Sequence, residues 1–101
     1  MNKVIREGKV AVLYSPGFGA GWYSWNTEVK ECLFDPDIVK LVEEGAPIEK
    51  IEELADQKWP GHYWSAGKLV IEWVPEGTAF EIHEYDGSEC IQYASRDWLI
   101  A

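Results

Sequence analysis

The chain has 101 residues, 47% of them hydrophobic, and a formal net charge of −9 from 18 acidic against 9 basic side chains. This length and apolar share predict a single domain over residues 1–101. No segment has the roughly 20 consecutive apolar residues of a membrane span. Nucleic-acid phosphates require a basic face, so the charge argues against direct nucleic-acid binding.

The N-terminal part of the sequence predicts one strand and a loop. The apolar run Lys9–Tyr14 is typical of a strand that is covered on both faces. Residues 15–17 (Ser-Pro-Gly) end it, and a segment of small residues and rings follows up to Asn26. We call residues 15–26 the Gly/Trp loop. Asn26 or Thr27 is suited to cap a short helix that reaches Phe34.

Two helices are expected over residues 36–58. Asp35-Pro36 is a typical helix start, because the acid caps the first turn and proline fits the first helical position. Gly45 ends this helix. Pro47 then opens a second, amphipathic helix, which the sequence Trp-Pro-Gly at residues 59–61 ends.

The C-terminal part predicts strands over residues 68–74, 79–85 and 88–94, with a hairpin turn at Asp86-Gly87. Residues 98–100 are expected to add a last short strand. Strands grouped apart from helices favour the α+β class. The expected fold is therefore an N-terminal strand and Gly/Trp loop, two or three short helices, and a C-terminal antiparallel β-meander.

The two cysteines, Cys32 and Cys90, belong to no CxxC motif and are too few for a disulfide framework. Both are expected to be buried free thiols. The apolar run near the N-terminus is too short for the core of a signal peptide. These features together favour a cytoplasmic protein.

The Gly/Trp loop is the candidate ligand site. Its glycines let backbone N–H groups approach an anion such as phosphate, and its rings can stack on a nucleobase. The ligand-binding residues expected there and on the later strand are Ser15, Gly17, Gly19, Gly21, Trp22, Trp25, Asn26 and Trp73. The loop departs from the dinucleotide fingerprint, because Trp22 stands where the third glycine would fall. The alternative is a structural loop whose rings cover the sheet.

Three further groups of residues have both a functional and an ordinary interpretation. Glu81, His83 and Tyr85 share one side of a strand, where they could bind a metal or transfer protons, or face solvent. Glu72, Glu81 and Glu84 could line a pocket wall with Trp73, or be surface acids. The helical acids could form a DNA-like surface, or a solvated face paired with nearby lysines; they are Glu43, Glu44, Glu49, Glu52, Glu53 and Asp56.

No Ser/His/Asp or Cys/His catalytic set can be recognised in the sequence. We therefore expect no enzyme, no catalytic residues, no metal site and no cofactor.

Four blocks of the chain resemble a family of small, mostly uncharacterised bacteriophage proteins of about this length. The blocks are residues 10–26, 33–39, 72–78 and 84–89, and the resemblance extends over nearly the whole chain. It implies a protein of the host bacterial cytoplasm, and small bacteriophage proteins without catalytic residues often block host defence. No particular activity is carried over from this family.

Two functions remain open on this basis. In the first, a counter-defence protein sequesters a small nucleotide-type ligand on the Gly/Trp loop. In the second, the chain inhibits a host protein by direct contact, as an acidic mimic of nucleic acid. The oligomeric state, including a homo-oligomer, stays open.

Overall fold

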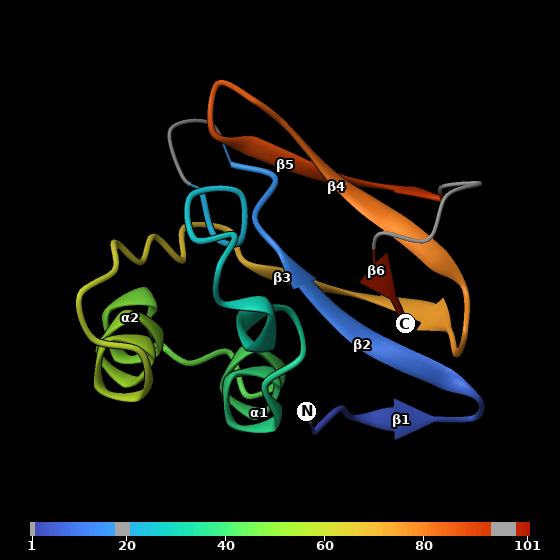
Figure 1. Cartoon of the computed structure of the whole chain (residues 1–101). Coiled ribbons are helices and arrows are strands. Elements are labelled where there is room, and N and C mark those ends of the chain that lie inside the picture. The colour runs from blue at the N-terminus through green and yellow to red at the C-terminus, as the bar shows by residue number, and fades with distance from the viewer. Residues whose placement is uncertain (1, 18–20, 94–98) are drawn as a thin grey trace.

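The computed structural model describes residues 2–17, 21–93 and 99–101 of the chain. In chain order the elements are β1 (Ile5–Arg6), β2 (Lys9–Tyr14), the 3-10 helix η1 (Lys30–Leu33), α1 (Pro36–Glu43), α2 (Ile48–Lys58), β3 (Val70–Pro75), β4 (Ala79–Tyr85), β5 (Ser88–Tyr93) and β6 (Leu99–Ile100). The helices lie on one side of the β2–β3 pair and the β4–β5 hairpin on the other (Figure 1). This arrangement confirms the α+β class. None of the described helices is long and apolar enough to cross a membrane.

The hydrophobic core is divided between the two sides of β2 and β3. The helix-side core consists of Ala11, Leu13, Trp22, Val29, Cys32, Ile38, Val39, Ile51, Ala55, Trp64, Ala66 and Leu69. The hairpin-side core consists of Val10, Val12, Leu33, Phe34, Val74, Phe80 and Ala101. Successive side chains of a strand point to opposite faces, so β2 supplies alternate residues to the two cores. The prediction of a strand covered on both faces is confirmed.

Both predicted helices form, and their ends follow the sequence signals. The Asp35 carboxylate accepts a hydrogen bond of 3.1 Å from the backbone N–H of Ile38, in the first turn of α1. Gly45 follows α1 with φ +70°, a left-handed conformation that glycine adopts without strain. Pro47 immediately precedes α2, as expected.

The short helix that we expected to reach Phe34 is a single 3-10 turn, η1. Val29 precedes it, so neither Asn26 nor Thr27 caps it. The Asn26 side chain instead donates a hydrogen bond to the backbone of Trp22 inside the loop. A side chain engaged in this way is not available to cap a helix.

The strands of residues 68–94 are antiparallel, but they divide between two sheets instead of forming one meander. The strand order is β1-β2-β3 in the first sheet and β5-β4-β6 in the second. The turn after Pro75 carries Phe80 into the hairpin-side core, where it is fully buried. The face of β4 therefore packs on the first sheet, and its edge does not extend that sheet. Ala94 and Trp98, which the expected strands included, lie outside the described residues.

The hairpin turn at Asp86-Gly87 is confirmed. Both residues have positive φ angles, 53° and 84°, as the two-residue turn that matches strand twist requires. The β4–β5 register is continuous from Phe80 opposite Tyr93 to Tyr85 opposite Ser88.

The two cysteines are unpaired, as expected. Cys32 lies in the helix-side core, and burial raises the pKa of its thiol. Cys90, however, is exposed, which corrects the expectation that both are buried. The cause is the alternation along β5, which turns Glu89 inward and Cys90 outward.

Candidate functional site

The Gly/Trp loop surrounds a carboxylate that belongs to the chain itself. Glu89, on β5, is 1% exposed. Its Oε1 accepts a hydrogen bond of 2.9 Å from the backbone N–H of Ser15. Its Oε2 accepts bonds of 3.0 Å from the N–H of Trp22 and 2.7 Å from the N–H of Ser24. The loop therefore does direct N–H groups at an anion, and that anion is Glu89.

Backbone N–H groups hold the Glu89 carboxylate in the part of the chain that the structure describes. Among the described residues, no lysine, arginine or histidine forms an ion pair with it. Hydrogen bonds from N–H groups to a carboxylate are stronger than those between neutral groups. The Glu89 N–H also donates 2.7 Å to the Ser15 carbonyl, which fixes β5 to the end of β2. Glu89 thus joins the hairpin to the loop.

Three of the expected ligand-binding residues are buried and bonded within the protein. Trp22 is fully buried, and its indole Nε1 donates a hydrogen bond of 2.7 Å to the Cys32 carbonyl. Asn26 is 2% exposed and donates to the carbonyls of Trp22 and Tyr63, at 2.8 and 2.7 Å. The Ser15 hydroxyl donates to the Gly67 carbonyl. These groups are already engaged by the fold.

The described glycines of the loop make room for the protein's own atoms. A Cβ on Gly21 would lie 2.5 Å from the Trp25 ring, closer than real Cβ contacts allow. A Cβ on Gly17 would lie 3.3 Å from the Gly67 carbonyl oxygen. Gly19 lies outside the described residues. At Gly21 and Gly17, therefore, the absence of a side chain serves packing.

The remaining two expected residues, Trp25 and Trp73, are not fully buried. Trp25 is 48% exposed and forms a tilted ring pair with Tyr63, with centroids 5.5 Å apart. Trp73 is partly buried on β3, and the Arg6 guanidinium lies 5.1 Å from the centroid of its ring. The Trp25–Tyr63 pair is therefore an exposed aromatic surface at the edge of the loop.

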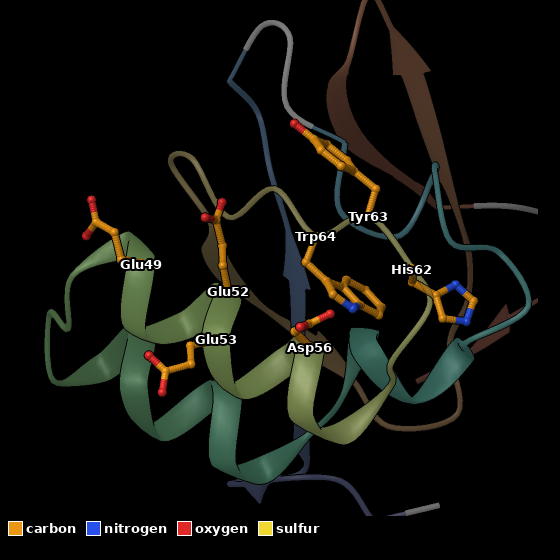
Figure 2. A pocket seen from close by; sticks show the side chains of 7 residues that line it. All are labelled: Glu49, Glu52, Glu53, Asp56, His62, Tyr63 and Trp64. Atoms are coloured by element: carbon orange, nitrogen blue, oxygen red, sulfur yellow. The ribbon is translucent and has the colours of Figure 1, made fainter.

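Beside this pair lies a cavity of about 330 Å³, which we call the acidic groove. Its lining residues are Glu49, Glu52, Glu53 and Asp56 of α2, and His62, Tyr63 and Trp64 of the segment after it (Figure 2). Figure 2 shows the acids along the helix, with the Trp64 ring between the helix and the rest of the domain. Four carboxylates and an exposed ring thus border one hollow.

The carboxylates of the acidic groove have no cationic partner in the described part of the chain. Lys58, at the end of the same helix, is 3.3 Å from Asp35 and 2.8 Å from Asp37 and so points elsewhere. Glu52 accepts a hydrogen bond of 2.9 Å from the Ala66 N–H, which holds one carboxylate in place. The expected pairs between the helical acids and nearby lysines are not found among the described residues: Lys58 pairs with Asp35 and Asp37, and Glu43 pairs with Arg6.

The aromatic part of the groove is firmly supported. Trp64 is 7% exposed, and its Nε1 donates a hydrogen bond of 3.1 Å to the Trp59 carbonyl. Its ring also packs against those of Trp22 and Trp59, with centroids 4.9 and 5.2 Å apart. The His62 Nδ1 lies 3.2 Å from a Glu28 oxygen. Tyr63, at 63% exposed, remains open at the rim.

The other acids that were expected to line a pocket lie in different sheets or bond other side chains. Glu72 belongs to β3 and Glu81 and Glu84 to β4, in different sheets, so the expected pocket wall of these acids does not extend along neighbouring strands. Glu72 accepts hydrogen bonds from the hydroxyls of Tyr14 and Tyr93, and this contact raises the pKa of Tyr93. Within the described residues, no group of three or more His, Cys, Asp or Glu could hold a metal ion.

Glu89 was not among the residues predicted from the sequence, although the strand pattern around it indicates its burial. Alternation along residues 88–93 places Glu89 on the same face as Ile91, which packs against the hairpin-side core. An acid on the apolar face of a strand needs a buried partner. That requirement, combined with a glycine-rich loop, indicates an internal carboxylate site.

Comparisons of the chain with protein-family models, curated proteins and solved structures gave no match. They neither support nor oppose the resemblance to bacteriophage proteins.

Proposed function

We propose that the chain is a binding protein whose acidic groove, with the adjoining Trp25–Tyr63 pair, takes a basic segment of a partner protein. The main support for this function is that the four groove carboxylates have no cationic partner among the described residues. A formal net charge of −9 adds long-range attraction to a basic partner.

The spacing of the groove acids supports this function because it costs stability. Glu49 and Glu53 are four residues apart on α2, as are Glu52 and Asp56. Like charges at this spacing destabilise a helix by about 0.2–0.5 kcal/mol for each pair. A cationic ligand would relieve the repulsion, so the energy lost in the free protein is recovered on binding.

The adjoining rings favour arginine as the contacting residue. A guanidinium can bond a carboxylate with two parallel N–H groups and can also stack on an aromatic face. Tyr63 lines the groove together with the four carboxylates, and the Trp25 ring pairs with that of Tyr63. Nucleic-acid-binding proteins present arginine-rich and lysine-rich surfaces to phosphates. The chain would then act as an acidic mimic that occupies such a surface on a host protein.

The alternative, sequestration of a nucleotide-type ligand, is less well supported. The loop N–H groups that were expected to hold a phosphate already bond Glu89. A phosphate in the acidic groove would meet four carboxylates. Binding of a nucleotide is therefore the alternative outcome of the binding experiment.

The test is a calorimetric titration of the whole chain with a hexa-arginine peptide, with hexa-glutamine as the neutral control. Wild-type protein should bind the arginine peptide, more weakly as salt rises. The double substitution Glu49→Gln with Glu53→Gln should weaken binding about tenfold, because two surface ion pairs are each worth up to about 1 kcal/mol. It should leave the melting temperature unchanged or raise it, since repulsion on α2 falls.

A matched control separates the groove from the overall charge. Glu7→Gln with Glu76→Gln removes the same two charges from exposed positions in the turns before β2 and after β3. It should leave binding within about twofold of the wild type if the groove is the site. Equal weakening by both double variants would contradict the proposal. A nucleotide or cyclic dinucleotide that raises the melting point, with no binding of the peptide, would support sequestration instead.

A further inference from the structure

The β4–β5 register brings a thiol and an imidazole together on the outer face of the hairpin. His83 is the register partner of Cys90, and Glu81 is the partner of Gln92. Directly opposed residues of antiparallel strands project to one face, with Cβ atoms about 5 Å apart. Cys90 is exposed, and the His83 side chain is 54% exposed, so both can be reached from solution.

Glu81 contacts His83, and Gln92 contacts Cys90. The Glu81 carboxylate Oε2 lies 2.8 Å from His83 Nε2 and can only accept, so this nitrogen donates, and in the neutral ring Nδ1 is then an acceptor. The Gln92 amide Nε2 donates a hydrogen bond of 3.7 Å to Cys90 Sγ. A thiol, an imidazole, a carboxylate and an amide from two strands thus lie on one face of the hairpin.

We propose that Cys90 is the nucleophile of a thiol–disulfide exchange site, with His83 as its base and a low-molecular-weight disulfide as its co-reactant. The Cys90 thiol proton passes to His83 Nδ1, and the thiolate attacks one sulfur of the disulfide. The disulfide bond breaks as the new bond to Cys90 Sγ forms, and the departing thiolate takes the proton from His83. The products are a mixed disulfide on Cys90 and one free thiol.

Cys32 provides an internal reference for this site. It is fully buried, and desolvation raises the pKa of its thiol, which disfavours the thiolate that exchange requires. In the folded protein, exchange should therefore occur at Cys90 before Cys32.

The site is tested by the reaction rate of the folded chain with 4,4′-dithiodipyridine, an uncharged disulfide that the acidic surface does not repel. Mass spectrometry should place the first label on Cys90, and Cys90→Ser should abolish the fast phase. His83→Gln should slow this phase severalfold, because glutamine cannot act as the base that takes the thiol proton. Gln92→Ala should also slow it.

The matched control is His62→Gln, the same substitution at the other histidine, which should leave the rate of Cys90 unchanged. The His83→Gln variant should keep the parent melting curve, since the His83 ring is half exposed. The His62→Gln rate is measured well below its melting temperature, because His62 contacts Glu28. Equal rates for the parent and His83→Gln would overturn the proposal. First labelling at Cys32 would overturn it as well.

Discussion

Replacing Glu89 with alanine should lower the free energy of unfolding by about 3–9 kcal/mol, since each buried N–H group left without an acceptor costs about 1–3 kcal/mol. Three such groups, on Ser15, Trp22 and Ser24, bond this one carboxylate. Domains of this size have a total stability of about 5–15 kcal/mol. The variant should therefore be partly unfolded at ambient temperature. Urea denaturation followed by circular dichroism measures the effect.

Two further variants define the cause of this loss. Glu89→Gln keeps the shape but replaces one acceptor oxygen by a donor, so it should lose about half as much stability as Glu89→Ala. Glu76→Ala removes an exposed acid of the β3–β4 turn and should change stability by less than about 0.5 kcal/mol. A Glu89→Ala protein as stable as Glu76→Ala would show that the loop does not depend on the carboxylate.

Trp22→Ala should be the other large loss, about 3–5 kcal/mol, as is usual when a fully buried tryptophan is truncated. The Trp22 ring packs on Trp64 with centroids 4.9 Å apart, and its Nε1 bonds the Cys32 carbonyl. Removing it leaves a cavity in the helix-side core and an unpaired carbonyl. Thermal and urea melting curves measure the loss.

Trp25→Ala is the comparison for Trp22→Ala, because both are tryptophans of one loop. Trp25 is 48% exposed, so its loss should cost less than about 1.5 kcal/mol of stability. It should weaken binding of the arginine peptide, because the Trp25–Tyr63 surface is reduced. A stable Trp22→Ala protein that has lost binding would return the ligand site to the Gly/Trp loop.

Local signals in the sequence were sufficient for most of the secondary structure. Helix starts at Asp35 and Pro47, and the hairpin turn at Asp86-Gly87, depend on residues next to one another in the chain. The buried strand Lys9–Tyr14 is recognisable because its apolar run is continuous. Such features need no knowledge of distant partners.

Sheet partners could not be predicted in the same way. Strand β3 pairs with β2, some 60 residues earlier, and β4 packs its Phe80 face on them. Consecutive strands usually pair, so the local pattern favoured a meander. The side on which a strand buries its apolar face depends on both cores, which local alternation does not specify.

In the candidate site, too, local features were predictable from the sequence and contacts between distant residues were not. The Gly/Trp loop was expected to direct N–H groups at a ligand, but those of Ser15, Trp22 and Ser24 bond Glu89, which comes more than 60 residues later in the chain. Trp22 and Trp25 are alike in the sequence, and only tertiary packing buries one and exposes the other. Likewise, the acids of α2 form a groove only because residues 62–64 fold back beside them.

We propose that the basic partner binds this protein at the acidic groove and the Trp25–Tyr63 pair. Backbone amide shifts of the ¹⁵N-labelled chain, recorded while the hexa-arginine peptide is added, test it most directly. We predict shift changes in α2 and residues 62–64, together with the Trp25 indole signal, and unchanged N–H signals for Ser15, Trp22 and Ser24. Changes centred on the N–H groups that bond Glu89, with α2 unaffected, would contradict it.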